Sequence, residues 1–293
     1  MTEHSEPFMT IAQTTYRQGD PSTVPVVLVH AFPVDHRIWD ECADRLIDCS
    51  DGDGDPAFGV YALEMPGAGE CPVPTAEQTG PVAEDGAYPE AMTRMAESYA
   101  AALRKAGFDK AVWVGISMGG YLILELHRLH PEMFAGIMLC DTKAGGDAPA
   151  TRANRVAIAE ECERHDTVDP VMHFAESHDG DSVWKRSDEA VALFSGWIRS
   201  QDPRGVAWRE RMAAARPDET DQLAKITVPA GIVSGTLDPS SAPDRMRPIA
   251  EQMTGTDCAF TVIEDAGHFT CVEKPDEVAR AILDLWRRAS AAD

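Results

Sequence analysis

Residues 111–120, Ala-Val-Trp-Val-Gly-Ile-Ser-Met-Gly-Gly, decide the fold of this 293-residue chain. The first six are apolar and rich in β-branched residues, as in a buried strand, whereas residues 118–130 have the composition of a helix. A serine at a sharp strand-to-helix turn has a strained backbone, and its neighbours two positions away must be small. Gly115 and Gly119 meet that demand, so Ser117 is predicted to be a nucleophile. The alternative is a glycine-rich packing turn with an idle serine.

Short apolar runs alternate with helical patterns on both sides of this stretch. That alternation is typical of a mainly parallel sheet covered by helices. The predicted fold class is therefore α/β, with a mostly parallel central sheet flanked by helices. Strands are predicted at 24–30, 59–63, 111–116, 134–140, 230–234 and 258–263, and helices at 35–48, 88–106, 118–130 and 276–288.

The alternation stops in the segment 144–225, which has helical stretches but no convincing strand. The segment is rich in aromatic residues and therefore has enough apolar surface to cover a pocket, although packing elsewhere is also open. Phe174, Trp184 and Trp197 are the predicted substrate-binding residues of this lid. The predicted parts are a first part of the core at 1–143, a helical cap or lid at 144–225 and a second part of the core at 226–293. Helices within the lid are expected near 152–165, 169–177, 187–200 and 205–215.

The charge and composition of the chain limit what it binds. Asp and Glu number 49 against 26 Lys and Arg, and the resulting net charge of −23 disfavours contact with nucleic-acid phosphate and anionic membranes. The first residues lack a basic and an apolar signal region, and no apolar run approaches the roughly 20 residues of a membrane helix. We therefore expect a cytoplasmic protein that acts on a small molecule, without a nucleic-acid or membrane partner. The sequence does not specify its oligomeric state.

No metal site is predicted. The seven cysteines form an odd set without CxxC spacing, which favours reduced, mostly buried thiols over disulfides or zinc. The acidic run at 50–55 resembles the start of a calcium loop, but Ala62 stands where the terminal glutamate belongs and Pro56 breaks the pattern. A surface loop is therefore expected at this acidic run.

The remaining histidines and glycines carry no cofactor motif. The pairs His127/His130 and His173/His178 lack the HExxH arrangement and are expected to be ordinary helix residues. No glycine cluster has the spacing of a dinucleotide-binding loop or a P-loop. We expect no cofactor.

The serine motif and two later segments resemble the α/β-hydrolase family, in which the catalytic partners follow in the order serine, acid, histidine. Asp238 comes just after the predicted strand 230–234, and His268 just after the strand 258–263. The resemblance implies that His268 is the general base and that Asp238 orients it, because a serine hydroxyl attacks well only when a base takes its proton. Asp141 also follows a strand, and some relatives take their acid there, so Asp141 is the alternative to Asp238.

A further segment, Val-His-Ala-Phe-Pro at residues 29–33, resembles the family's His-Gly-x-Pro loop. The resemblance implies an oxyanion hole formed by the backbone N–H groups of Phe32 and Met118, which is worth roughly 3–4 kcal/mol per donor in measured cases. Ala31 replaces the usual glycine without blocking this role. His30 is expected to brace the loop and not to move protons.

The resemblance extends from about residue 24 to about residue 286 and implies a reaction class. Relatives that open epoxides or displace halide use an aspartate nucleophile, whereas this chain has Ser117. We therefore expect a serine hydrolase that cleaves a carboxylic ester or lactone of a small, apolar or aromatic substrate through an acyl-enzyme, most similar to the small esterase and enol-lactonase group. Alternatives on the same fold are a C–C bond hydrolase, a perhydrolase and an aminopeptidase. Outside catalysis, the alternative is a ligand-binding receptor or scaffold that uses the same pocket.

Overall fold

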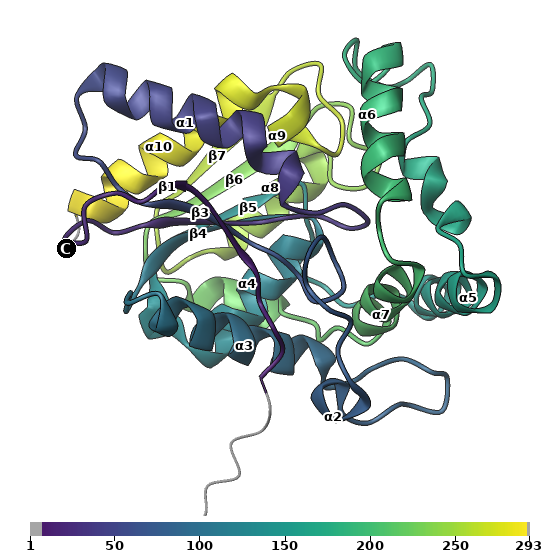
Figure 1. Ribbon diagram of the computed structural model, residues 1–293. Helices are drawn as coiled ribbons and strands as arrows, with labels where there is room; N and C mark the ends of the chain where they lie inside the picture. Colours follow the sequence, from purple (N-terminus) through teal and green to yellow (C-terminus); the bar gives the residue numbers. More distant parts are fainter. Residues whose placement is uncertain (1–7, 292–293) are drawn as a thin grey trace, which may run out of the picture.

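The computed structural model describes residues 8–291, and a seven-stranded sheet forms its centre (Figure 1). The strand order is β1-β3-β2-β4-β5-β6-β7, and all neighbouring strands are parallel except β1 and β3. The predicted α/β fold with a mostly parallel sheet is thereby confirmed. The strands are β1 Gln13–Arg17, β2 Val26–Val29, β3 Val60–Leu63, β4 Ala111–Ile116, β5 Phe134–Cys140, β6 Ala230–Gly235 and β7 Cys258–Ile263.

The edge strand β1 is absent from the sequence-based prediction. Its sequence, Gln-Thr-Thr-Tyr-Arg, is mostly polar, and none of its residues is fully buried. It forms a strand because it pairs antiparallel with β3, with Gln13 opposite Leu63 and Thr14 opposite Ala62. Such pairing leaves little trace in hydrophobic periodicity, since an edge strand buries little apolar surface.

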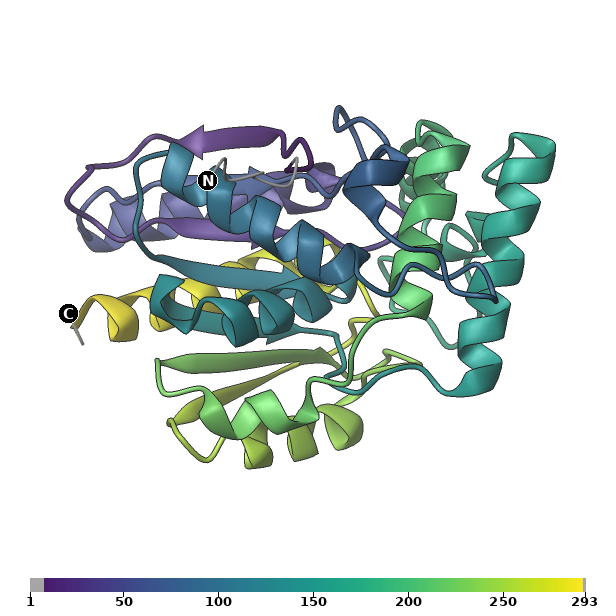
Figure 2. The same cartoon turned by 90° about the horizontal axis from the view of Figure 1, so that it is seen from below.

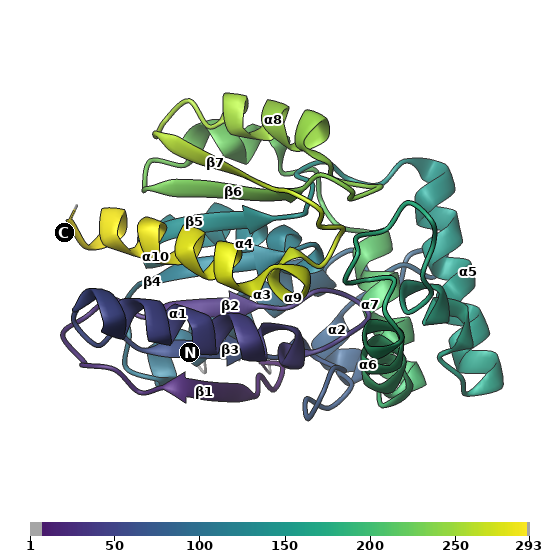
Figure 3. The same ribbon diagram turned by 90° about the horizontal axis from the view of Figure 1, so that it is seen from above.

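Helices cover both faces of the sheet, as expected for parallel strands joined by crossovers. Helices α1 and α10 lie together on one face, and α3, α4 and α8 lie on the other (Figures 1 and 3). The sheet is therefore buried from both sides, and its polar chemistry is confined to the strand ends. The elements outside the segment 144–225 are η1 His36–Trp39, α1 Asp40–Asp53, α2 Ala76–Thr79, α3 Ala91–Lys105, α4 Met118–Leu129, η2 Pro131–Met133, α8 Pro243–Gln252, α9 Thr270–Glu273 and α10 Pro275–Ala291.

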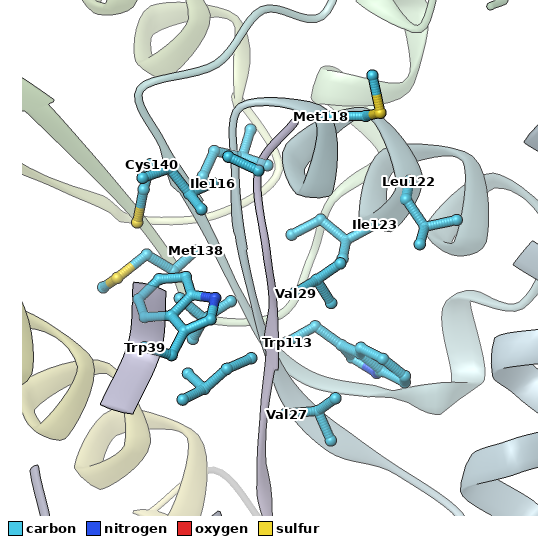
Figure 4. Packing of buried hydrophobic residues seen from close by; sticks show 14 of the residues in the cluster. Val27, Val29, Trp39, Trp113, Ile116, Met118, Leu122, Ile123, Met138 and Cys140 are labelled. Carbon is cyan, nitrogen blue, oxygen red and sulfur yellow. The ribbon is translucent and has the colours of Figure 1, made fainter. Parts of the chain in front are cut away.

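The central strand β4 is buried along its whole length. Trp113 points to the face covered by α4, where Val27 of β2 and Ile123 of α4 lie, whereas Ile116 points to the opposite face beside Met138 of β5 (Figure 4). Burying one large apolar side chain contributes on the order of 2 kcal/mol, so the strand that ends at Ser117 is anchored from both sides.

The segment between β5 and β6 has only helical elements among its described residues. Helices α5, α6 and α7 lie beyond one end of the sheet (Figures 1 and 2). The backbone of α7 touches the loop after β3, because a methyl group added to Gly205 would overlap the carbonyl group of Gly67. The inserted segment thus contacts the core at Gly67 and Gly205, where the backbones are too close for any residue other than glycine. Its elements are α5 Pro149–His165, η3 Asp169–Phe174, α6 Asp188–Arg199, α7 Pro203–Ala214 and η4 Thr220–Lys225.

The prediction of a surface loop at the acidic run 50–55 is wrong for residues 50–53, which are helical. Helix α1 continues to Asp53 and ends at Gly54, whose φ of 78° is typical of a helix terminus. Arg287 of α10 binds Asp53 at 2.7 Å and Asp55 at 2.6 Å. The run continues the helix because arginine from a distant segment offsets its negative charge, which the local pattern does not show.

All seven cysteines are free in the structure, as predicted, and five of them are buried. Cys49 and Cys258 are the partly exposed ones. Within residues 8–291, no helix has the length and apolar character that a membrane crossing requires.

Candidate active site

Ser117 occupies the turn between β4 and α4 with φ 53° and ψ −113°, a conformation that few residues with a side chain adopt. Hydrogen bonds hold this turn: the Ser117 N–H donates to the carbonyl oxygen of Cys140 at 2.9 Å, and the Thr142 hydroxyl donates to the Ser117 carbonyl oxygen at 2.6 Å. A methyl group on Gly115 would lie 2.5 Å from the backbone of Gly119. The small residues predicted on either side of the serine are therefore required by contact between the strand and the helix.

Three side chains from the carboxyl ends of three strands meet at this turn. Ser117 follows β4, Asp238 follows β6 and His268 follows β7. The Ser117 hydroxyl lies 2.8 Å from Nε2 of His268, and Nδ1 of the same ring lies 2.8 Å from Oδ2 of Asp238. This geometry places a base beside the hydroxyl and a carboxylate behind the base, so a proton can pass from serine to histidine.

The carboxylate of Asp238 is fully enclosed and richly hydrogen-bonded. Its Oδ2 accepts from the Ser241 hydroxyl at 2.6 Å, and its Oδ1 accepts from the backbone N–H of Ser240 at 2.8 Å. Burial by itself would raise the pKa of Asp238, but the contact with His268 and these hydrogen bonds outweigh it and hold the pKa below its ordinary range. The carboxylate in turn outweighs the effect of burial on His268 and raises the pKa of the imidazole.

Asp141, the alternative acid, lies close by at the end of β5 but has other partners. Its Oδ1 accepts from the backbone N–H of Gly235 at 2.9 Å, and its Oδ2 lies 2.5 Å from the Thr270 hydroxyl. Burial, together with the nearby charge of Asp238, raises the pKa of Asp141 well above its ordinary value. The structure therefore brings His268 to Asp238, whereas Asp141 is hydrogen-bonded to the segments around them.

A cavity of about 360 Å³ opens beside Ser117, and Phe32 and Met118 are among the residues that line it. Within residues 8–291, the backbone N–H of neither Phe32 nor Met118 donates a hydrogen bond. Met118 is the first residue of α4, where the helix dipole adds positive potential. Both amides are thus free to bind an oxygen atom of a ligand.

Buried polar groups brace the loop that carries Phe32. Nδ1 of His30 contacts the carbonyl oxygen of Ala31 at 2.9 Å, and Nε2 accepts from the backbone N–H of Met65 at 2.9 Å. Both ring nitrogens of His30 are therefore used within the protein, which gives this histidine the structural role expected of it.

Arg209 of the inserted helix α7 supports the same loop from the other side. Its buried guanidinium donates to the carbonyl oxygen of Val34 at 3.0 Å and to the Gln201 side chain at 3.1 Å, and it lies 5.5 Å from the centre of the Phe32 ring. Burial lowers the pKa of Arg209 to about 10. The inserted segment thus contributes directly to the position of Phe32.

Among the described residues, one group of side chains has donor atoms close enough together to hold a metal ion: Asp35, His36 and Glu64. These donors already have partners in the protein. Asp35 binds Arg37 at 2.7 Å and the Gln201 amide at 2.7 Å, and Glu64 is hydrogen-bonded to His36. Burial would raise the pKa of Glu64, but its contacts with His30 and His36 outweigh burial and hold the pKa below its ordinary range. Asp35, His36 and Glu64 thus form part of a network of hydrogen bonds and ion pairs within the protein.

The aromatic residues predicted for the lid divide into two sets. Phe174 lines the cavity and meets Phe32 edge-on, with 6.1 Å between ring centres. Trp184 and Trp197 instead pack against Phe194, at 6.1 Å and 5.3 Å, and lie outside the cavity lining. The structure therefore brings one of the three predicted residues to the site, because the half-buried indole rings of Trp184 and Trp197 pack against Phe194 within the inserted segment.

Several residues of the site were not predicted from the sequence to have a functional role. His173 and His178, expected to be ordinary helix residues, both line the cavity, and His178 lies in the loop after η3. Glu273 accepts from the backbone N–H of Gly267 at 2.9 Å and binds the Ser182 hydroxyl, so it ties the loop before His268 to the inserted segment.

Comparison with known families decides the affiliation of the chain. The family model described as "Alpha/beta hydrolase family" matches residues 26–281. The chain belongs to the alpha/beta hydrolase family. A comparison with curated protein sequences finds no match.

Solved structures of other alpha/beta hydrolases are similar over nearly the whole chain. An esterase from Thermogutta terrifontis, solved with malate bound, is 30% identical with a TM-score of 0.79, over 96% of this chain and 94% of that one. The enol-lactonase from Burkholderia xenovorans LB400 is 20% identical with a TM-score of 0.74, over 95% and 96%. A bromoperoxidase from Bacillus anthracis is 15% identical with a TM-score of 0.73, over 95% and 96%. The latter two share the fold.

Proposed function

We propose that this alpha/beta hydrolase is a serine hydrolase that cleaves a carboxylic ester or lactone of a small, apolar or aromatic substrate. The observation that carries the proposal is the unbroken chain of hydrogen bonds from the Ser117 hydroxyl through His268 to Asp238, with 2.8 Å at each step. It stands at the edge of a cavity of about 360 Å³, a volume suited to a small molecule. The likeness to the Thermogutta terrifontis esterase supports the same reaction class.

In the proposed reaction, Oγ of Ser117 attacks the carbonyl carbon while Nε2 of His268 takes the hydroxyl proton. The N–H groups of Phe32 and Met118 bind the carbonyl oxygen as it becomes negative. The tetrahedral intermediate collapses, His268 gives its proton to the leaving alcohol, and the acyl group stays on Ser117. A water molecule, deprotonated by His268, then attacks the acyl carbon and releases the acid and the free serine. Asp238 stabilises the imidazolium in both halves of the reaction.

We further propose that the segment 144–225 acts as the lid of this site, between core parts at 1–143 and 226–293. Phe174 supplies an apolar surface opposite Phe32, which favours an apolar or aromatic group in the substrate. Arg209 and Glu273 link the lid to the loops that carry the oxyanion donors and the base. The lid therefore both covers the cavity and supports its reactive groups.

A fluorophosphonate probe tests the proposal directly, because it reacts with a serine only when a base activates the hydroxyl. We expect rapid, stoichiometric labelling of the folded wild-type protein, with the adduct located on Ser117 by digestion and mass spectrometry. Labelling should disappear in Ser117→Ala and persist in Ser22→Ala, where an exposed serine outside the cavity lining is changed. A folded protein that resists the probe would favour a ligand-binding receptor or scaffold. A panel of p-nitrophenyl esters, lactones and dienoic acids then separates ester, lactone and C–C bond cleavage.

The pH dependence should report the ionisation of His268. Because Asp238 raises the pKa of His268 above its ordinary 6.5, and only the neutral ring accepts a proton, kcat/KM should rise with pH through a midpoint above 6.5. Loss of the carboxylate charge in Asp238→Asn should move that midpoint to lower pH. The measurement is kcat/KM for a neutral ester between about pH 5 and pH 9 in both proteins. An unchanged or higher midpoint in the variant would contradict the proposed pairing.

A further inference from the structure

The loop after β5 supplies a cation to the cavity. Thr142 holds the carbonyl group of Ser117, and the next residue, Lys143, lines the same cavity as the Ser117 hydroxyl. The Lys143 side chain is exposed, and its ammonium forms no ion pair or hydrogen bond with another residue of the described chain.

The charged groups closest to Lys143 are mostly positive. Arg216, Arg155 and Arg245 act on its ammonium, as does the carboxylate of Asp147. That carboxylate is bound by Arg155 at 2.6 Å and by Arg216 at 2.8 Å, and Arg155 also binds Glu210 at 2.6 Å. Partial burial of the ammonium in the cleft and the guanidinium groups lower the pKa of Lys143, and an added negative charge would offset the repulsion from the guanidinium groups.

Arg245 extends this positive region along the cavity rim. Its guanidinium donates to the backbone carbonyl oxygens of Pro239 and Ser240, at 3.1 and 3.4 Å, and both of those residues line the cavity. Neutral carbonyl groups leave the charge of Arg245 uncompensated. Lys143 and Arg245 thus give this rim two cations that form no ion pair with a carboxylate among the described residues.

Four acidic residues line the cavity, Asp141, Glu176, Asp181 and Glu273, but the carboxylate that acts most strongly on Lys143 is that of Asp147, outside this set. Burial raises the pKa of Asp141 well above its ordinary value, and Glu273 accepts hydrogen bonds from the Gly267 N–H and the Ser182 hydroxyl. Glu176 and Asp181 belong to the loop after η3, where Lys185 is the nearby cation.

Lys185, the other lysine of the cavity, is already committed to protein partners. Its ammonium donates to the Phe174 carbonyl oxygen at 2.8 Å and lies 4.5 Å from the centre of the Phe194 ring. Lys143 is thus the lysine whose ammonium is available to a ligand.

We propose that the substrate carries a carboxylate that binds Lys143 while its ester or lactone carbonyl lies at Ser117. The substrate class is then the monoester of a dicarboxylic acid, or a lactone with a carboxylate substituent, with an apolar stem between the two groups. This inference rests on the proposed hydrolase function and specifies its substrate. Arg245 adds to the attraction from the rim without direct contact, so affinity for the anion should fall as salt is added.

The test measures binding to the inactive Ser117→Ala protein by calorimetry, so that it does not depend on turnover. The ligands are the monomethyl esters of the dicarboxylic acids from succinic to suberic acid, each paired with the neutral methyl ester of the same chain length, such as monomethyl adipate with methyl hexanoate. We expect Ser117→Ala to prefer the anionic member of the best pair by about tenfold or more, and the further change Lys143→Met to remove about tenfold of that preference. Lys143→Arg should retain it, because the charge remains.

The control Lys105→Met removes the same charge from an exposed position at the end of α3, outside the cavity lining, and should leave both affinities unchanged. Equal binding of anionic and neutral esters at every chain length, or a preference that survives Lys143→Met, would overturn the inference. Neither result affects the serine hydrolase proposal, which depends on labelling and turnover of the wild-type protein. If the wild-type protein is not labelled by the fluorophosphonate but anion binding still depends on Lys143, the proposed serine hydrolase reaction would be rejected. The carboxylate-binding site at Lys143 would then be retained.

Discussion

Replacement of Ser117 by alanine is expected to lower kcat on the best ester substrate by about 10⁶-fold, because a triad without its nucleophile loses the covalent step altogether. The residual rate should come from binding and from the N–H groups of Phe32 and Met118, which the substitution leaves in place. The measurement is the initial rate at saturating ester, with protein concentration high enough to detect slow turnover. A kcat that falls by less than about tenfold in Ser117→Ala would show that another group attacks the carbonyl.

The fold should survive this substitution, which makes the loss of rate interpretable. The hydrogen bonds that hold the turn use the backbone N–H and carbonyl groups of Ser117 and not its hydroxyl. Alanine can occupy the same strained φ of 53°, at a cost similar to that of serine. The thermal midpoint of Ser117→Ala should therefore lie within a few degrees of the wild-type value, as should that of the control Ser22→Ala.

Asp238→Asn is expected to reduce kcat by about 10⁴-fold. The amide cannot stabilise the imidazolium that forms during attack, and it favours the wrong tautomer of His268. Asn is close to Asp in size, and its carbonyl oxygen can still accept from one of the two donors, the Ser240 N–H or the Ser241 hydroxyl, which bind different oxygens of Asp238. The substrate-binding residues are unchanged, so the loss should appear in kcat far more than in KM. The measurement is a comparison of kcat and KM on one neutral ester at a pH where His268 is deprotonated in both proteins.

Asp141→Asn is the matched control for this substitution. Burial raises the pKa of Asp141 well above its ordinary value. The carbonyl oxygen of an amide can still accept from the Gly235 N–H, and its NH2 group can donate to the Thr270 hydroxyl, which donates to Asp141 in the wild-type protein. We expect a loss of less than about tenfold in kcat, given that the imidazole contact is untouched. A reversed ranking of Asp238→Asn and Asp141→Asn would move the role of the triad acid to Asp141.

The part of the site that could be predicted from the sequence is encoded locally. The strand before Ser117, the glycines around it and the helix after it lie within a short stretch, and each leaves a pattern of composition or period. Asp238 and His268 could be predicted because the loops that follow parallel strands meet at one edge of the sheet. Chain order and strand ends therefore suffice to bring these three residues together.

The residues that escaped prediction depend on contacts between distant segments. Glu273 binds the Ser182 hydroxyl across 91 positions of sequence, and nothing near either residue indicates that contact. The prediction failed in the opposite way for Trp184 and Trp197, which were expected to bind substrate but lie outside the cavity lining. Composition indicates that large aromatic rings will be buried, but not whether they are buried against a ligand or against one another.

The support that Arg209 gives to the loop of Phe32 affects how specificity could be re-engineered in this scaffold. Exchanging the whole inserted segment for that of another hydrolase would remove the guanidinium that binds the Val34 carbonyl group, and leave that buried acceptor without a donor. Productive chimeras should therefore keep α7 in the recipient together with α5, because Arg155 and Glu163 of α5 bind Glu210 and Arg211 of α7 at 2.6 and 2.7 Å. The exchangeable module thus lies inside the insertion, between the end of α5 and Pro203, and not at its ends.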